Sequence, residues 1–172
     1  FQNLSTTNPV PLETYYGKGI LATEASFTVT DYCTGPSSPT YPPPPCPSGS
    51  TVFSVFRNLY EGINVGDTEI NGVAPYVFMV RKTLFEGNWT GIRSDAGSRA
   101  TIIQNTFNLG VVPPNASGVQ IIQGLIIHDT HKSFTIEENS FYRDPNISQD
   151  VNDFWELIGI RTSSIGEYNN II

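Results

Sequence analysis

Short runs in which apolar and polar residues alternate recur along the chain, and none of them is long. They occupy residues 26–30, 76–80, 100–103 and 134–136. Alternation with a period of two predicts short strands whose alternate side chains point inward. No segment sustains the 3.6-residue period of an amphipathic helix. The pattern therefore predicts an all-β protein built of many short strands.

A Gly followed by Ile or Leu opens each unit of an internal repeat. The Gly residues of these dipeptides lie 43, 29, 33 and 35 residues apart, and they are Gly19, Gly62, Gly91, Gly124 and Gly159. The longest interval contains a proline-rich insertion, which accounts for its extra length. An alternating strand follows each of the first four dipeptides. Similar spacing of similar segments predicts stacked copies of one structural unit.

An Asn-x-aromatic sequence closes the unit. The clearest copies are 105–107 and 139–141, and looser copies are 58–60 and 169–171. Asn tolerates the left-handed backbone conformation that a sharp turn needs, so we expect these Asn residues at the turns. We also expect stacked Asn side chains to hydrogen-bond between coils. The aromatic residues expected to stack inside are Phe85, Phe107 and Phe141.

Each unit thus has three short strand-like segments joined by turns. One such coil cannot bury its apolar face alone, but stacked coils form a continuous core. The sequence therefore predicts a parallel β-solenoid. A sandwich of short antiparallel strands is the alternative, although it has no reason to repeat the same order of segments.

The repeat resembles a known group of proteins. The Gly-Ile dipeptides and residues 133–141 (Ser-Phe-Thr-Ile-Glu-Glu-Asn-Ser-Phe) are similar to right-handed parallel β-helix repeats of large secreted surface proteins from Bacteroidetes-type bacteria, many of them exported by type 9 secretion. The resemblance implies a right-handed parallel β-helix of about five coils over most of residues 19–172. Residues 33–47, 110–120 and 142–156 depart from it as loop insertions. The abrupt ends lead us to expect that residues 1–172 are a single β-helix fragment of a longer protein.

Charge and hydropathy narrow the set of partners. The chain has 16 acidic and 9 basic side chains, and its formal net charge is −7. This balance argues against a nucleic-acid partner, which would require clustered Lys and Arg. No apolar run reaches the roughly 18 residues needed to span a bilayer, so we expect no membrane insertion.

The two cysteines, Cys33 and Cys46, bracket the proline-rich insertion. Seven of the 13 prolines lie within 36–47, and such a segment cannot join a sheet ladder. A Cys33–Cys46 disulfide would close this excursion at its base and would suit an extracellular or cell-surface protein. Two unrelated buried thiols remain the alternative, and a polyproline ligand for a partner domain is another.

An acidic stretch within 142–156 is the candidate metal site. It contains Asp144, Asp150, Asp153 and Glu156, whose oxygens could hold Ca²⁺. Their spacing matches no standard calcium loop, so a solvated insertion without a cofactor is the favoured interpretation.

Aromatic and histidine residues are the candidate ligand-binding groups. Trp155 and Tyr142 lie on the same insertion and could stack on sugars or on a protein partner, as could Trp89. His128 and His131 belong to a polar turn, with Asp95 expected near the equivalent turn of the preceding coil. No catalytic residue is assigned, because the chain has no P-loop, nucleophile elbow or Cys/His zinc pattern.

These observations favour a non-catalytic structural or adhesive role in a larger bacterial surface protein. The expected partners are neighbouring coils or domains of the same protein, and surface glycans or other proteins met by the loops. A catalytic β-helix that acts on polysaccharide, as a lyase or glycoside hydrolase, is the alternative. A secreted cargo or subunit held in a larger assembly is a second alternative.

Overall fold

The computed structural model describes residues 17–33, 46, 49–66, 76–95, 99–109, 120–128, 134–143 and 153–161. All the regular structure in these ranges is β-strand. Sheet I contains β1 (Lys18–Thr23), β6 (Glu61–Gly66), β9 (Thr90–Asp95), β12 (Gln120–His128) and β15 (Asp153–Arg161). Sheet II contains β2 (Phe27–Val29), β7 (Val77–Arg81), β10 (Arg99–Ile103) and β13 (Phe134–Glu137). Sheet III contains β5 (Ser54–Arg57), β8 (Thr83–Glu86), β11 (Thr106–Leu109) and β14 (Ser140–Arg143).

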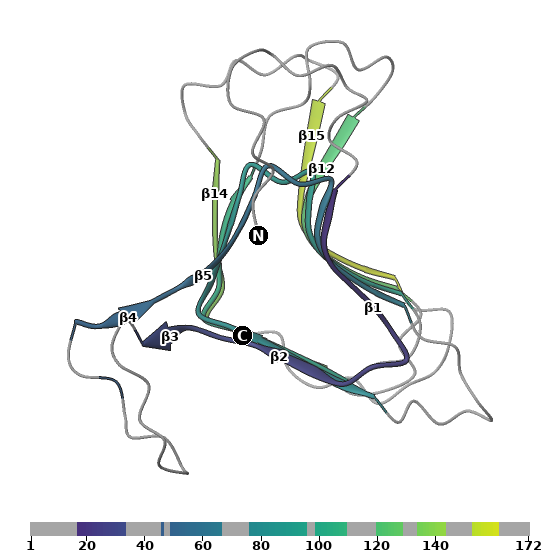
Figure 1. Ribbon diagram of the computed structural model, residues 1–172. Helices are drawn as coiled ribbons and strands as arrows, with labels where there is room; N and C mark the ends of the chain where they lie inside the picture. The colour runs from purple at the N-terminus through teal and green to yellow at the C-terminus, as the bar shows by residue number, and fades with distance from the viewer. Residues whose placement is uncertain are drawn as a thin grey trace.

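The chain visits sheets I, II and III in that order, one strand in each, and then returns to sheet I. Within each sheet the strands are stacked in sequence order and every pairing is parallel. Figure 1 shows the three sheets as the sides of a triangle. We call three consecutive strands, one from each sheet, a rung. The arrangement is compatible with the predicted solenoid, and the parallel pairings exclude the antiparallel sandwich.

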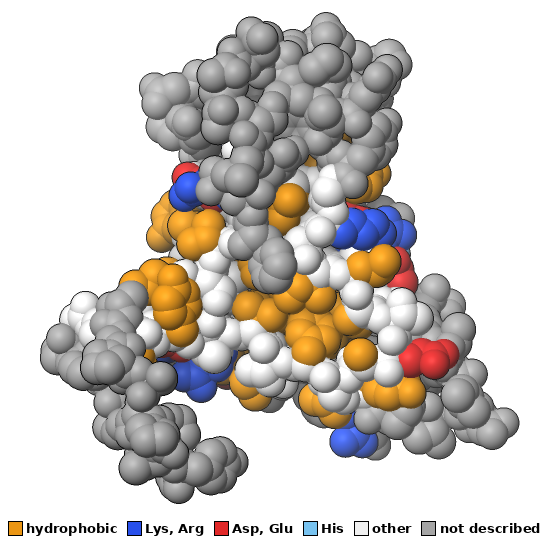
Figure 2. All heavy atoms as spheres, viewed as in Figure 1, with side chains coloured by type: hydrophobic (Ala, Val, Ile, Leu, Met, Phe, Trp, Pro, Cys, Tyr) orange, Lys and Arg blue, Asp and Glu red, His pale blue; other side chains and the backbone are white. Residues whose placement is uncertain are grey.

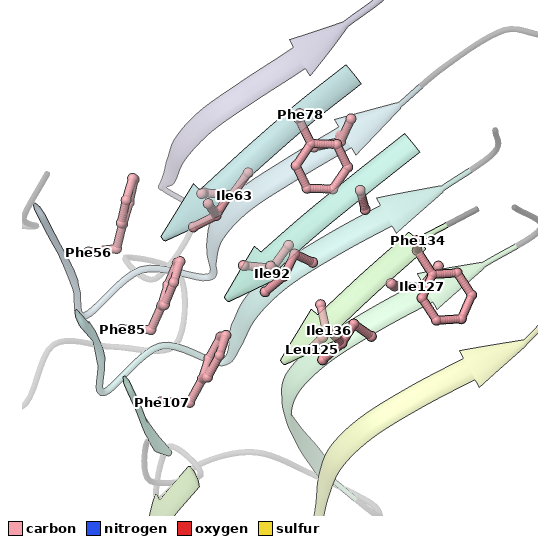
Figure 3. Packing of buried hydrophobic residues seen from close by; sticks show 14 of the residues in the cluster. Phe56, Ile63, Phe78, Phe85, Ile92, Phe107, Leu125, Ile127, Phe134 and Ile136 are labelled. Atoms are coloured by element: carbon pink, nitrogen blue, oxygen red, sulfur yellow. The ribbon is translucent and has the colours of Figure 1, made fainter. Parts of the chain in front are cut away.

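Four phenylalanines form a ladder inside sheet III. Consecutive rings are nearly coplanar, with interplanar angles of 10°, 6° and 8°, and their centroids are 5.2, 4.8 and 4.8 Å apart. The ladder consists of Phe56, Phe85, Phe107 and Phe141. The predicted internal aromatic stack is therefore confirmed, with Phe56 as a further member. Figure 3 shows three of these rings one above the next.

The remaining core residues come from sheets I and II. In sheet I, Ile63, Ile92 and Leu125 lie opposite one another in register and are fully buried. In β7, Phe78 and Val80 are buried while Val77 is exposed, which confirms the predicted alternation. Figure 3 shows these apolar columns converging between the sheets. Burial of such side chains contributes roughly 1.5–3 kcal/mol each.

Glycine is required in sheet I because the phenylalanine ladder lies against it. A methyl group built on Gly62 would lie 2.6 Å from the carbonyl oxygen of Gly91 and 2.8 Å from Cδ1 of Phe85. The equivalent position in the next rung, Gly91, faces Phe107 in the same way. The Gly of each repeat and the Phe of the same rung therefore form one packing unit.

Asparagine side chains connect successive rungs at the corner between sheets II and III. Nδ2 of Asn105 donates to the carbonyl oxygen of Val80 and to Oδ1 of Asn139, each at 2.9 Å, and its Oδ1 accepts from the backbone N–H of Thr83. This confirms the expected hydrogen bonding between coils. The expected left-handed conformation lies one residue earlier, at Gln104 in this rung. Glu138 adopts it before Asn139 in the same way, whereas Asn58, one of the looser copies, has a φ of 55° itself. Asn105 and Asn139 lie at the turns as expected.

The fifth Gly-Ile dipeptide does not align with the other four. In the pairing of β12 with β15, Leu125 lies opposite Ile158 and Ile126 lies opposite Gly159. Leu157, rather than Gly159, therefore occupies the position equivalent to Gly124. The interpretation of Gly159 as the next copy of the repeat was wrong by two residues.

Excursions interrupt the repeat at the three places predicted from the sequence, and a further long connection joins β6 to β7. A short antiparallel pair, β3 (Tyr32–Cys33) and β4 (Thr51–Val52), lies between β2 and β5, and a Cys33–Cys46 disulfide with a Cα–Cα distance of 5.5 Å confirms the predicted bridge. The prolines of this insertion lie outside the described residues. The other two excursions follow β11 and β14, so both leave from the corner between sheets III and I. Their strand boundaries lie inside the predicted loops, since β14 includes Tyr142 and Arg143 and β15 begins at Asp153.

Candidate functional site

The outer face of sheet I carries charged residues at fixed distances from the glycine of each rung. The residue before the glycine is Lys18, Glu61, Thr90 or Gln123, in successive rungs. The fourth residue after it is Thr23, Gly66, Asp95 or His128. In Figure 1 the strands of this sheet bend midway along their length. Parallel stacking thus aligns side chains that are about 30 residues apart in sequence.

Glu61 is the most buried acid on this face. Only 5% of its surface is exposed, and its carboxylate forms an ion pair with Lys18 at 2.7 Å. Nδ2 of Asn64 donates a second hydrogen bond to the same carboxylate at 2.9 Å. A buried charge requires this kind of pairing, because an unpaired carboxylate would be strongly disfavoured.

A second group of charges lies on the following rungs. Nε of Arg93 donates to Asp95 at 2.6 Å, and Nδ1 of His128 lies 3.0 Å from the other carboxylate oxygen of Asp95. The hydrogen bond with Asp95 raises the pKa of Arg93 above its ordinary value. The expectation that Asp95 lies near His128 is confirmed, since the two are register partners in β9 and β12.

Glu156, a candidate calcium ligand, is held by a neighbouring strand. Nε2 of Gln123 donates to its carboxylate at 2.6 Å, and the carboxylate also lies against Gly159. Asp153 lies in β15, where only its backbone is described, and Asp144 and Asp150 lie outside the described residues. In the part of the chain that the structure describes, no group of three or more His, Cys, Asp or Glu side chains could hold a metal ion.

The candidate ligand-binding residues are distributed over different surfaces. Tyr142 is 58% exposed on β14 in sheet III, whereas His128 ends β12 in sheet I. The backbone of Trp155 lies opposite Ile122 in β15, and His131 lies outside the described residues. The structure therefore does not bring Tyr142 and His128 into one site.

A cavity opens at the end of the stack where β1, β2 and β5 are the outermost strands. Its volume is about 620 Å³, and its apolar walls include Ile20, Val29 and Phe56. Figure 2 shows apolar side chains gathered at the centre of the triangular end. These residues occupy the same inward positions as the buried core of later rungs, so among the described residues the cavity continues that core at the end of the stack.

Asp31 anchors the start of the disulfide-tied insertion. Its carboxylate accepts a hydrogen bond from the Thr30 hydroxyl at 2.7 Å and lies 3.4 Å from Nζ of Lys82. The Thr30 hydrogen bond, followed by the contact with Lys82, lowers the pKa of Asp31 from its ordinary value of 3.8, against the opposing effect of burial. The insertion is thereby tied electrostatically to the next rung.

Apart from the proximity of Asp95 and His128, the charged face of sheet I was not predicted from the sequence. Its signal is the fixed offset from the repeat glycine, which places residues 18, 61 and 90 in one column and residues 66, 95 and 128 in another. Aligning the repeats by their glycine residues would have placed these charged residues in common columns. Tyr60, which lies beside this face, was missed for the same reason.

Comparison with protein-family models, with curated proteins and with solved structures found no match to this chain. Among the described residues there is no helix with the length and apolar character that crossing a bilayer requires.

Proposed function

We propose that the chain is a non-catalytic extracellular segment of a right-handed parallel β-helix, within a larger bacterial surface protein. About five coils at roughly 4.8 Å per coil would give a rod of some 24 Å. The rod holds its loop insertions in fixed positions, where they meet a ligand or an opposing surface. Export by a type 9 route and a Bacteroidetes-type source belong to this proposal through the sequence resemblance.

The observation that carries the proposal is the continuity of the internal ladders. Phe56, Phe85, Phe107 and Phe141 stack without interruption, and the glycine column beside them leaves no space for a larger residue. A core that is continuous along the stacking direction makes a stiff scaffold, since each rung is held by its neighbours. The excursions leave only at corners, where their length does not disturb the ladders.

The disulfide supports the extracellular part of the proposal. Disulfides persist in oxidising environments and are rare in the cytosol. The Cys33–Cys46 bridge closes an insertion on the outside of the stack. A disulfide stabilises such an insertion only where cellular reductants do not reduce it.

Incubation with a panel of neutral and acidic polysaccharides tests the non-catalytic part. We expect no release of reducing ends or unsaturated products above a boiled-protein control. Turnover that disappears in the Asp150→Asn/Asp153→Asn double variant would overturn the proposal.

A catalytic β-helix remains the second candidate, because the structure collects acids and bases on one sheet face. Lys18, Glu61, Arg93 and Asp95 span adjacent rungs of sheet I. Both carboxylates are already engaged by cations, which favours a structural or binding role over proton transfer. Turnover of any polysaccharide that is lost in Asp95→Asn and retained in Glu138→Gln, a change at an exposed corner, would establish this candidate instead.

A further inference from the structure

Two aromatic residues lie in one column at the corner between sheets III and I. Tyr60 and Trp89 immediately precede β6 and β9, and their rings are 5.8 Å apart at an angle of 45°. The backbone N–H of Thr90 donates to the carbonyl oxygen of Tyr60, which fixes the two residues in adjacent rungs. The core does not need these rings, because the residues just before them, Leu59 and Asn88, fill the inner side of the corner.

The polar face of sheet I begins directly beside this aromatic pair. Glu61 follows Tyr60 in the chain, and Lys18 forms an ion pair with Glu61 on the adjacent rung. Arg93 lies opposite Asn64 in the pairing of β6 with β9, and Asn64 is the residue that donates a hydrogen bond to Glu61. Its hydrogen bond to Asp95 uses Nε, one of five N–H donors on the group.

The charges of this surface balance. Lys18 and Arg93 each have an acidic partner, Glu61 and Asp95 respectively, so the patch has donors and acceptors without a net charge of its own. The chain as a whole has a formal net charge of −7. Such a surface suits an uncharged ligand with many hydroxyl groups and gives no attraction to a polyanion.

We propose that Tyr60 and Trp89, together with Lys18 and Arg93, form a binding site for a neutral oligosaccharide that runs along the stack. The buried Glu61 holds Lys18 in place through their ion pair. The apolar face of a pyranose ring packs on an aromatic side chain, while its hydroxyls exchange hydrogen bonds with planar charged groups. The two rings lie on adjacent rungs, which are about 4.8 Å apart along the stack, so the site spans two rungs. This inference rests on the proposed function and names the ligand of its adhesive role.

The position of the loop excursions agrees with this assignment. The chain leaves β11 at Leu109 and re-enters sheet I at Gln120, and it leaves β14 at Arg143 and re-enters at Asp153. Both excursions therefore start and finish at the corner that carries the aromatic pair. In the register of sheet I, the backbone of Trp155 lies opposite Ile122, which continues the column of Tyr60 and Trp89.

Tryptophan fluorescence tests the site directly. The chain has two tryptophans, so Trp155→Phe leaves Trp89 as the sole reporter. This variant of the full 172-residue chain is titrated with cellohexaose, xylohexaose and mannohexaose, and with trigalacturonate as the anionic comparison. We expect a saturable change in Trp89 emission with at least one neutral hexasaccharide and none with trigalacturonate. Tyr60→Ala should weaken the binding at least tenfold.

Two further variants separate binding from folding. Tyr60→Phe retains the ring and should bind within threefold of the parent, and Tyr32→Ala removes an exposed ring from β3 and should leave binding unchanged. Thermal unfolding followed by circular dichroism establishes that each variant is folded. The proposal is overturned if no neutral hexasaccharide alters the emission at about 10 mM, if a folded Tyr60→Ala binds like the parent, or if trigalacturonate binds more tightly.

Assaying the same hexasaccharides for cleavage keeps the two proposals distinct. Binding without cleavage supports both. Cleavage would refute the non-catalytic function while the binding site stands. A lack of both binding and cleavage would refute the site alone.

Discussion

Removing the side chain of Asn105 tests how successive rungs are held together. Asn105 is 1% exposed, and its amide satisfies the buried N–H of Thr83 and the carbonyl oxygen of Val80. Asn105→Ala leaves both backbone groups without these partners, and each loss costs about 1–3 kcal/mol. The hydrogen bond to Oδ1 of Asn139 is lost as well. We therefore expect the free energy of unfolding to fall by about 2–5 kcal/mol, a large part of the stability of an ordinary domain.

Equilibrium unfolding in urea, followed by far-ultraviolet circular dichroism, measures this change. Gln104→Ala is the matched control, because Gln104 precedes Asn105 and its side chain makes only an exposed hydrogen bond to Glu138. The control should change the unfolding free energy by no more than about 0.5 kcal/mol. If the two variants lost the same small amount, the Asn ladder would not hold the rungs together.

Three further predictions concern packing, charge and the disulfide. Gly91→Ala should cost about 1–3 kcal/mol of unfolding free energy, because its methyl group would lie 2.5 Å from the carbonyl oxygen of Gly124 and 2.7 Å from Cδ1 of Phe107. In the control Gly66→Ala the added methyl group meets no atom within 4 Å, so the free energy of unfolding should not change. If Gly91→Ala and Gly66→Ala lost the same free energy in a urea titration, the glycine–phenylalanine packing would be contradicted. Asp31 has a lowered pKa in the folded chain, so its contribution is present above its unfolded value of 3.8 and is lost as pH falls through the folded value. The difference in unfolding free energy between the wild type and Asp31→Asn should therefore have its full size at pH 7 and disappear as pH falls below 3.8. A difference that grows on acidification would show that Thr30 and Lys82 do not stabilise the ionised carboxylate. The double variant Cys33→Ser/Cys46→Ser removes a disulfide between residues 13 apart in the sequence. It should lower the free energy of unfolding by about 3 kcal/mol, because the unfolded chain gains conformational entropy. Unchanged thermal unfolding would show that the disulfide stabilises only its own loop.

The core could be predicted from the sequence because its residues repeat by type. The spacing from strand to aromatic residue identified Phe107 and Phe141, and the Gly-Ile dipeptides identified the column that faces them. Both signals arise from packing, since a ring that lies on a ring in the next rung must recur at the same point of each unit.

Register and backbone conformation were harder to predict. Gly159-Ile160 looks like another copy, yet Leu157 occupies the glycine position, because the pairing of the whole strand β15 decides the register. The left-handed residues at one corner are Lys82, Gln104 and Glu138, three types with no shared preference for that conformation. The turn imposes it on whichever residue precedes the ladder position.

The candidate site could not be predicted residue by residue. Glu61 and Arg93 are ordinary charged residues in a linear sequence, and only stacking makes neighbours of Lys18 and Glu61. The proximity of Asp95 to His128 is the exception, because the spacing of the repeat predicted it. Of the acidic residues singled out instead, Asp153 and Glu156 belong to β15, while Asp144 and Asp150 lie outside the described residues.

Cross-linking between rungs tests the stacked architecture on which the account depends. Thr101 and Thr135 are register partners in β10 and β13, so a Thr101→Cys/Thr135→Cys variant should form an intramolecular disulfide on mild oxidation. Thr101→Cys/Glu137→Cys moves one partner two residues along the strand and should remain reduced at both positions. Peptide mapping by mass spectrometry reads out the two bonds. The account predicts the first cross-link together with the native Cys33–Cys46 bridge, and equal cross-linking of the two variants, or none in either, would contradict it.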